Sequence, residues 1–426
     1  MFFKFQIIRY WLLIRFRKPR SKTALQKLQK KNWHKFQQVL LRSPFYRDKV
    51  QENTPLAAYP LMNKASFMKQ FDQINTQNIR VDEAYKVAQE AEKSRDFSPE
   101  INHITVGLSS GTSGNRGIFL ASQKERAFWV AAVLDRVIGF SLKKRSVAFF
   151  LRANSNLYSS VKSRILSFAF FDLYDALAQH VSRLNALQPT ILVAQPSMLL
   201  DLAQEVKAGR LQIHPQKIIS VAEVLYPEDK AVLEATFGQT IHQVYQCTEG
   251  FLASTCAYGT LHFNEDFLII EKKFLDESKT RFHPIITDLK RSSQPIVRYE
   301  LNDIIQEKTD CPCGSPMMGI AQIEGRADDV LVFKNVEGQT IKIYPDFFRR
   351  AIIAADAAIQ DYTLVQRNAH LLELYIQGTE EHFQKAKRNI DALLNKYQAK
   401  AVTIIRTTIK HHEQGNKLRR IKYEKN

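Results

Sequence analysis

The stretch from Ser109 to Gly117 constrains this chain most, because its residues, Ser-Ser-Gly-Thr-Ser-Gly-Asn-Arg-Gly, are nearly all small or polar. Glycines allow tight turns and close approach of the backbone to a ligand. Hydroxyl and N–H groups can surround phosphate oxygens, and an arginine can neutralise them. An apolar segment precedes the stretch, and a helical pattern from Glu125 to Val137 follows it. We predict a phosphate-binding loop, with a flexible surface loop as the alternative; it is not a Walker loop, since no Gly-Lys-Ser/Thr closes it.

Four further motifs follow this loop along the chain. They are Tyr245-Gln246-Cys247-Thr248-Glu249-Gly250, Arg298-Tyr299-Glu300-Leu301-Asn302-Asp303, Gly325-Arg326-Ala327-Asp328-Asp329 and Gly415-Asn416-Lys417-Leu418-Arg419-Arg420. In content and order the five motifs resemble those of the adenylate-forming enzymes, and in particular the branch of phenylacetate–CoA ligase and coenzyme F390 synthetase. Ser43-Pro44-Phe45-Tyr46-Arg47 and Pro60-Leu61-Met62-Asn63-Lys64 resemble the opening segment of that branch. The chain departs from the pattern at Leu301-Asn302, which replaces Thr-Gly, and by one extra residue before Lys417.

The resemblance implies an α/β fold with a large N-terminal domain and a small, mobile α+β C-terminal domain. The length of 426 residues also exceeds one ordinary core. Strand-like and helical segments alternate after residue 145, which favours parallel βαβ units. The expected strands are 145–151, 190–194, 217–222, 240–245, 362–365, 371–376 and 401–406, and the expected helices are 23–41, 172–187, 227–237, 380–397 and one from Pro196. We expect a basic N-terminal segment at 1–22, a large domain at 23–326 and a small domain at 327–426.

The resemblance also implies roles in the ATP-dependent activation of a carboxylic acid. Outgoing pyrophosphate would be held by Ser109, Ser110, Gly111, Thr112, Ser113, Gly114 and Arg116. The rest of the nucleotide would contact Tyr245 at adenine, Thr248 at the α-phosphate, Asp303 at ribose, Arg326 at ribose or phosphate, and Glu223 in the same cleft. Glu249 would hold Mg²⁺, because a hard carboxylate suits a hard cation. Lys417 would stabilise the pentavalent transition state, and Asp328 would be the hinge of the small domain.

Each of these residues has a plainer interpretation. A Thr-Glu pair after a strand is often a helix cap. Asp303 after a strand is commonly a turn residue, and an Arg-Asp-Asp cluster is commonly a solvated loop. Lys417 lies in a basic tail, where an ordinary solvated lysine is the alternative.

Cys311-Pro312-Cys313 and the pair Cys256 and His262 form a Cys₃His set. This set of ligand types is a regular structural zinc site. The spacing is not that of a zinc finger, and some members of the resembled branch carry a similar arrangement. We predict a structural zinc site here, with buried free thiols as the alternative. Cys247 is expected to serve in packing rather than as a ligand.

The net charge of +18 is concentrated near the N-terminus. Residues 1–50 hold fourteen lysines and arginines and one acid, Asp48, and the first sixteen residues interleave basic with large apolar side chains. This pattern suits an interfacial helix on an anionic membrane, and the alternative is a helix packed on the main domain. Arg9 and Arg15 interrupt the apolar run, which disfavours a secretory signal. No motif supports nucleic-acid binding, and no apolar run is long enough to predict a spanning helix.

We interpret the chain as a cytoplasmic enzyme, peripheral on the inner face of a membrane if the N-terminal segment binds there. It would convert an aryl or fatty acid into an acyl-adenylate and pass the acyl group to coenzyme A or to a carrier protein. Four cysteines in this length favour a reducing compartment. Two alternatives stay open: transfer of AMP to a cofactor hydroxyl, as in coenzyme F390 synthesis, and a non-catalytic, membrane-associated binding protein.

Overall fold

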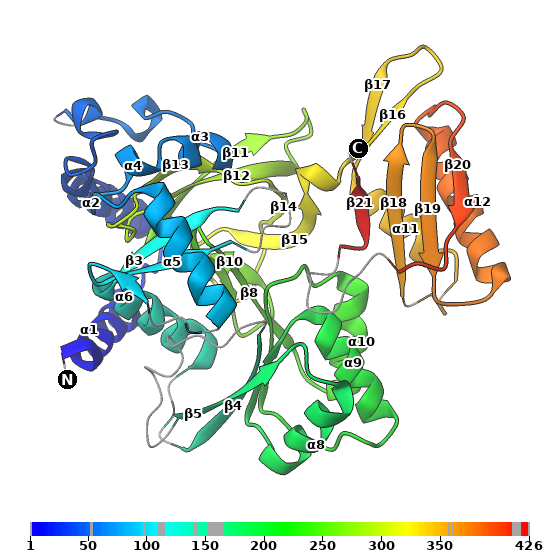
Figure 1. The fold of residues 1–426 in the computed structure, drawn as a ribbon, viewed down its shortest axis with the longest axis horizontal. Coiled ribbons are helices and arrows are strands. Elements are labelled where there is room, and N and C mark those ends of the chain that lie inside the picture. The colour runs from blue at the N-terminus through cyan, green and yellow to red at the C-terminus, as the bar shows by residue number, and fades with distance from the viewer. Residues whose placement is uncertain are drawn as a thin grey trace. The chain divides into compact units, whose positions relative to one another are not determined.

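The computed structural model describes residues 2–51, 54–94, 96, 99–109, 116–139, 141, 143–151, 166–356, 358–359, 361–410 and 419–424. Contacts divide the chain into two compact units (Figure 1). The first unit comprises residues 1–301 and 305–322, and the second comprises residues 302–304 and 323–426. Each unit contains a hydrophobic core of its own.

A twelve-stranded sheet forms the framework of the first unit. Its strands are β4 (Arg145–Leu151), β5 (Leu166–Asp172), β6 (Ile191–Ala194), β7 (Lys217–Ser220), β8 (Ile241–Cys247), β9 (Gly250–Thr255), β10 (Leu261–Phe263), β11 (Leu268–Phe274), β12 (Arg281–Asp288), β13 (Ile296–Glu300), β14 (Asp303–Lys308) and β15 (Gly319–Arg326). The order is β11-β12-β14-β15-β10-β9-β8-β7-β6-β4-β5, and β13 pairs with β12. The neighbouring strands β5, β4, β6, β7 and β8 pair in parallel. The pairs β8–β9, β9–β10, β11–β12 and β12–β13 are antiparallel.

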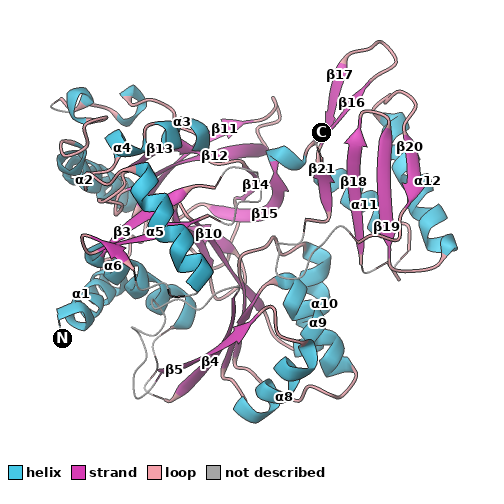
Figure 2. Ribbon diagram, in the orientation of Figure 1, coloured by secondary structure: helices cyan, strands magenta, loops and turns pink. Residues whose placement is uncertain are grey.

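Three helices pack beside the parallel strands (Figure 2): α8 (Leu177–Leu187), α9 (Pro196–Lys207) and α10 (Pro227–Phe237). Proline opens α9 and α10, as expected at a first helical position where no N–H is needed. Leu184, Leu199 and Leu233 are fully buried against the sheet, so the apolar side of each helix builds this core.

The other elements of the first unit precede this sheet in the sequence. The helices are α1 (Phe2–Phe16), α2 (Lys22–Leu40), α3 (Lys64–Lys69), α4 (Phe71–Ile74), α5 (Val81–Ser94) and α6 (Gln123–Val133), which continues into a π-helical turn, Leu134–Ile138. A separate antiparallel sheet contains β1 (Glu100–Ile101), β2 (Ile104–Leu108) and β3 (Ile118–Ser122). Within the described residues, no helix is both long and apolar enough to span a membrane.

The second unit is an α+β structure. Its strands are β16 (Leu331–Lys334), β17 (Thr340–Ile343), β18 (Tyr362–Asn368), β19 (Leu371–Ile376), β20 (Thr403–Arg406) and β21 (Ile421–Tyr423), and its helices are α11 (Pro345–Ile353) and α12 (Glu380–Lys396). Strands β20-β19-β18-β21 form one sheet, and β16-β17 form a hairpin. Phe333, Phe348 and Ile390 are completely buried in its core.

Most expected elements are confirmed, several with ends that differ by one to three residues, and one is wrong at its start. The strand at 145–151 is β4, and the helix at 380–397 is α12 with one residue fewer. The expected helix 172–187 begins only at Leu177, because Asp172 ends β5. Strand β5 pairs with β4 residue by residue from Leu166 to Asp172. Asp172 is therefore the last residue of a strand and not the first residue of the helix.

Candidate active site

The base of the predicted phosphate loop is closed by the residues that flank it. The Ser109 N–H donates to the carbonyl oxygen of Gly117 at 2.8 Å. The Gly117 N–H donates to Ser109 Oγ at 2.7 Å. These bonds continue the β2–β3 ladder, which ends at the pair Leu108 and Ile118. Ser110, Gly111, Thr112, Ser113 and Gly114 lie outside the described residues.

Arg116 is held by α5. Its guanidinium donates through both terminal nitrogens to the Glu92 carboxylate, and Nε donates to the Ser109 carbonyl oxygen at 3.0 Å. The hydrogen bonds to Glu92 raise the pKa of Arg116, so this group stays charged. Lys64, from α3, brings a second cation to the loop, with Nζ 3.5 Å from Ser109 Oγ. Sequence reasoning did not assign Lys64 a role, although it closes the opening segment that carries part of the resemblance.

Thr248 and Glu249 form the turn between β8 and β9. Thr248 Oγ1 donates to Glu249 Oε2 at 2.9 Å, and the hydroxyl of Tyr299 donates to Glu249 Oε1 at 2.9 Å. Burial, followed by the charge of Glu249, raises the pKa of Tyr299, so its hydroxyl remains a donor. Arg291 Nη1 donates to the Thr248 carbonyl oxygen at 3.0 Å. Tyr299 and Arg291 were missed from sequence, even though Tyr299 stands inside a recognised motif.

Glu223 follows β7 and caps helix α9. Its carboxylate accepts from the backbone N–H and from the hydroxyl of Ser197, both at 3.2 Å. Negative charge is favourable at a helix N-terminus. The preceding residue, Ala222, has a left-handed backbone with φ of 69°, which turns the chain sharply after the strand. Glu223 therefore stabilises the N-terminus of α9.

A cavity of about 550 Å³ lies in the first unit. Its lining includes Gly107 and Leu108, directly before the phosphate loop, and Gln246 and Thr248 of the second motif. Much of its wall is aromatic: Phe119, Phe128, Trp129, Phe149, Phe168, Phe251 and Phe267. Tyr245 does not line it; its ring lies 6.4 Å from that of Phe263. One largely apolar space thus reaches both the end of β2 and the Thr248 turn.

One of the residues that line this cavity is a buried acid, Asp288. Asp288 ends β12, and its Oδ1 accepts the Lys290 N–H at 2.8 Å. Burial raises the pKa of Asp288 to about 6, although Arg291 and the Lys290 N–H act in the opposite direction. A Cβ on Gly250 would lie 3.0 Å from Asp288 Oδ2. The glycine after Thr248-Glu249 therefore leaves room for this carboxylate.

The remaining predicted nucleotide contacts belong to the second unit. Arg326 Nε lies 3.9 Å from Asp303 Oδ1. Asp328 is part of a short 3₁₀ turn, Ala327–Asp329, and nothing is described of its side chain. Asp329 is ion-paired with Arg419. Lys417 lies outside the described residues.

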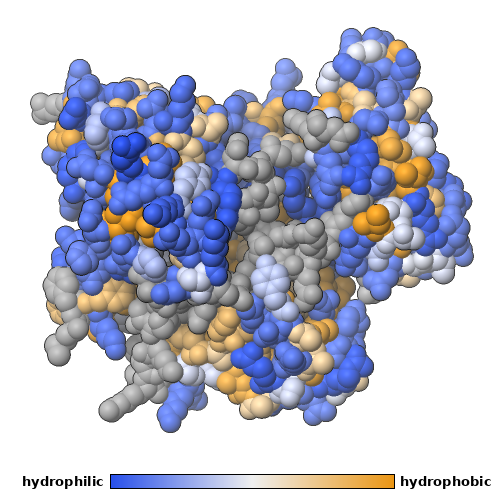
Figure 3. Space-filling model, viewed as in Figure 1, coloured by the Kyte–Doolittle hydropathy of each residue, from blue (hydrophilic) through white to orange (hydrophobic). Residues whose placement is uncertain are grey.

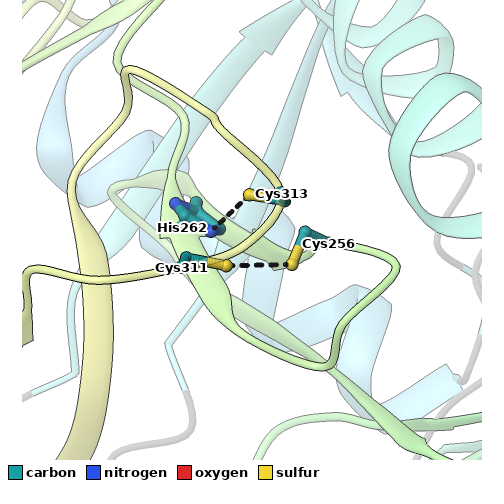
Figure 4. A group of neighbouring side chains, drawn as sticks. All are labelled: Cys256, His262, Cys311 and Cys313. Carbon is teal, nitrogen blue, oxygen red and sulfur yellow. Dashed lines mark hydrogen bonds between the residues drawn. The ribbon is translucent and has the colours of Figure 1, made fainter.

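The predicted Cys₃His set is assembled in the first unit (Figure 4). Cys256 follows β9, His262 lies on β10, and Cys311 and Cys313 lie between β14 and β15. Their ligand atoms all lie within 4.8 Å of one another. The Sγ atoms of Cys256 and Cys311 are 3.7 Å apart, and Cys313 Sγ is 3.3 Å from His262 Nε2. Cys247 is not part of this cluster.

This geometry fits a tetrahedral zinc ion. Zn–S bonds of about 2.3 Å would place two ligand sulfurs about 3.8 Å apart. His262 Nδ1 lies 3.0 Å from the Met317 carbonyl oxygen, which orients Nε2 toward the thiols, as an outer partner does for a metal-binding histidine. Burial opposes ionisation of Cys311, but hydrogen bonds from Thr260, the Cys313 backbone and His262 lower its pKa to about 6. The donor set is thus prepared to supply at least one thiolate.

The fold is that of the adenylate-forming CoA ligases, although no protein-family model matches the chain. The structure of 2-hydroxyisobutyryl-CoA ligase with 2-HIB-AMP matches with a TM-score of 0.67 and 17% identity, covering 95% of this chain and 89% of that one. Anthranilate CoA ligase with anthranoyl-AMP matches with a TM-score of 0.53 and 14% identity, covering 74% and 66%. In sequence, phenylacetate-coenzyme A ligase of Pseudomonas putida is 22% identical over 231 residues, or 50% of this chain and 51% of that enzyme. The sequence match therefore spans about half of that ligase.

Proposed function

We propose that this protein activates a carboxylic acid with ATP and then transfers the acyl group to a thiol. The thiol of coenzyme A is the acceptor that we propose. The observation that carries the proposal is a cavity whose lining includes Leu108, directly before the Ser109–Gly117 loop, and Thr248 of the second motif. A carboxylic acid in this cavity would meet a nucleotide bound by the two motifs. Structural neighbours bound to acyl-adenylates support this assignment.

The reaction needs two anions to be brought together. A carboxylate oxygen attacks the α-phosphorus of ATP, the bond to the bridging oxygen breaks, and pyrophosphate leaves. The protein must orient the two and neutralise the charge that develops. We assign the pyrophosphate to Ser109, Ser110, Gly111, Thr112, Ser113 and Gly114, with Arg116 and Lys64 as cations. Lys417 would act at the transition state.

The other roles follow the motifs. We assign Thr248 to the α-phosphate, Tyr245 to adenine, Asp303 and Arg326 to ribose, and Glu223 to a further contact with the nucleotide. Glu249 would hold Mg²⁺, which neutralises phosphate charge when bound. In the second half-reaction the thiol sulfur attacks the acyl carbon and AMP leaves. A carrier-protein thiol is the alternative acceptor.

The character of the cavity supports an apolar acid. Its aromatic wall favours an aryl or fatty substrate, because ligand pockets of this size bind mainly through apolar contact. A volume of about 550 Å³ leaves room for a group larger than a short-chain acid.

Pyrophosphate release from ATP across a panel of aryl and fatty acids tests the proposal. We expect release with one acid class and a loss of about 10²–10³-fold in the Lys417→Ala variant, as for other groups that stabilise a transition-state charge. Lys396→Ala, at the exposed end of α12, is the matched control. Product analysis separates the acceptors: acyl-CoA supports the proposal, whereas an adenylylated hydroxyl supports the coenzyme F390 synthetase-like alternative. No release with any acid, despite ATP binding, would favour a hydroxyl acceptor or a non-catalytic protein.

We also propose that Cys256, His262, Cys311 and Cys313 hold a structural Zn²⁺. Four protein ligands leave no open coordination position, so the ion would stabilise the fold and take no part in the chemistry. It would tie the β9–β10 turn to the β14–β15 connection. Free thiols in all described cysteines favour a reducing compartment, and we propose a cytoplasmic location.

A further inference from the structure

Helix α1 is anchored to the first unit by one of its faces. Ile7 and Ile14 are buried, and the ring of Tyr10 meets that of Phe128 on α6 edge-on at 5.6 Å. Arg15 and Lys18 lie 3.7 and 3.9 Å from the buried carboxylate of Asp135. The orientation of α1 is therefore set by contacts on its inner face.

The outer face of α1 is apolar and exposed. Phe5, Ile8, Leu12 and Phe16 have exposed fractions of 64%, 57%, 43% and 77%. Their spacing of three or four residues places them in one stripe, which extends about 17 Å along the helix at 1.5 Å per residue. In Figure 3 the surface over α1 mixes pale orange with blue. A contiguous stripe of this kind on a water-exposed helix marks an interaction surface.

Basic side chains lie beside this outer face, since Arg9 and Arg17 line the same shallow surface hollow as the apolar stripe. Lys4, Arg9, Arg17 and Arg20 lie on or directly after α1, and residues 1–50 contain fourteen lysines and arginines against a single acid. A second copy of the chain would bring the same positive charge to the stripe and would be repelled. An anionic surface would be attracted, and its apolar interior would accept the aromatic and aliphatic side chains.

We propose that the outer face of α1 docks on an anionic lipid bilayer with the helix axis in the plane of the membrane. Phe5, Ile8, Leu12 and Phe16 enter the boundary between headgroups and acyl chains, and the flanking arginines and lysines contact the headgroups. This inference is independent of the proposed acid activation, since none of these residues lines the 550 Å³ cavity.

Flotation of the full-length protein with vesicles tests the proposal. The probes are vesicles of phosphatidylcholine with about 30% phosphatidylserine, and vesicles of phosphatidylcholine alone. We expect binding to the mixed vesicles, at least about tenfold weaker binding to the neutral ones, and weakening in about 0.5 M salt, where charges are screened.

Two variants separate the apolar and basic contributions. Ile8→Gln/Leu12→Gln/Phe16→Gln should weaken binding at least about tenfold, and Arg9→Gln/Arg17→Gln should remove most of the preference for anionic lipid. Tyr258→Gln/Val336→Gln replaces exposed apolar residues elsewhere and is the matched control. Unchanged thermal unfolding of the variants shows that the inner face still anchors α1.

The proposal would be overturned if the wild type did not bind mixed vesicles, or if the Gln triple variant bound them as well as the wild type does. It would also be overturned by concentration-dependent dimerisation that the triple variant abolishes. The last result would assign the stripe to a second copy. Displacement from vesicles by single-stranded RNA, with tighter binding to the RNA, would assign it to nucleic acid.

Discussion

Two buried acids beside the cavity show how partners decide what a residue does. Glu125 accepts from the backbone N–H groups of Ser122, Ser292 and Ser293 and from two serine hydroxyls, so its oxygens are fully used in holding α6 to the loop after β12. Asp288 is equally buried but has fewer donors, and burial raises its pKa. Thus Glu125 holds two segments of the chain together, whereas Asp288 takes up a proton as the pH falls through about 6.

The proton on Asp288 makes the stability of the protein depend on pH. Its pKa is about 6 in the folded protein against 3.8 for the ordinary group, so the folded state binds the proton more tightly. The resulting stability is fully present below pH 3.8 and is lost as pH rises through about 6. We compare Asp288→Asn with the wild type by the difference between their free energies of unfolding, variant minus wild type. We expect this difference to increase by about 2 kcal/mol from about pH 4 to pH 7, because the wild type loses the stability that comes from its proton. Urea unfolding at each pH measures the free energy of unfolding, and Asp310→Asn is the exposed control. A difference between Asp288→Asn and the wild type that does not vary with pH would contradict the raised pKa of Asp288.

At the scale of elements, neighbouring strands bring the Cys₃His cluster together. His262 on β10 lies directly opposite Gly319 on β15. A Cβ on Gly319 would lie 2.6 Å from the Lys308 carbonyl oxygen, so only glycine lets β15 approach the end of β14 this closely. The connection between these strands then carries Cys311 and Cys313 over His262. Strand pairing therefore places ligands that are far apart in the sequence.

Removal of one thiol should release the proposed zinc. We expect about one zinc per chain in the wild type and almost none in Cys311→Ser or Cys313→Ser, with the melting temperature lowered by several degrees because metal binding contributes to folding. Cys247→Ser, outside the cluster, should keep its zinc. Elemental analysis of protein purified without chelators measures the content, and metal-free wild type that melts like the zinc-loaded form would argue for packed free thiols.

At the scale of the whole molecule, the chain forms two units with separate cores, and the long part of the second unit begins at Ile323. Gly325 has φ of 130°, a conformation open to glycine, and a Cβ there would have no neighbour within 4 Å. The 3₁₀ turn Ala327–Asp329 follows it. The prediction that Asp328 is a hinge rests on the Gly-Arg-x-Asp-Asp motif.

A proline at Asp328, the proposed hinge, should separate the two half-reactions. Proline restricts φ to about −65°, so Asp328→Pro limits rotation at this position. We expect pyrophosphate release to stay within about threefold of wild type and acyl-CoA formation to decrease at least about tenfold, because only the second step needs the rotation. Single-turnover assays of each step measure this, with Asp328→Ala as the control that keeps the backbone free. Equal losses in both steps would place the hinge elsewhere.

The sequence by itself determined the order of the motifs, the α/β fold class and most elements of regular structure. These depend on neighbours along the chain: glycine and hydroxyl content at 109–117, prolines that open α9 and α10, and alternation of apolar strands with amphipathic helices. Only the tertiary structure decided which distant residues meet. Tyr299 donates to Glu249, and Glu92 on α5 accepts from Arg116, because the folded chain brings these distant residues together. Asp172 belongs to a strand because β5 pairs with β4. The tertiary structure likewise decided which face of α1 is exposed, because α6 packs against the opposite face.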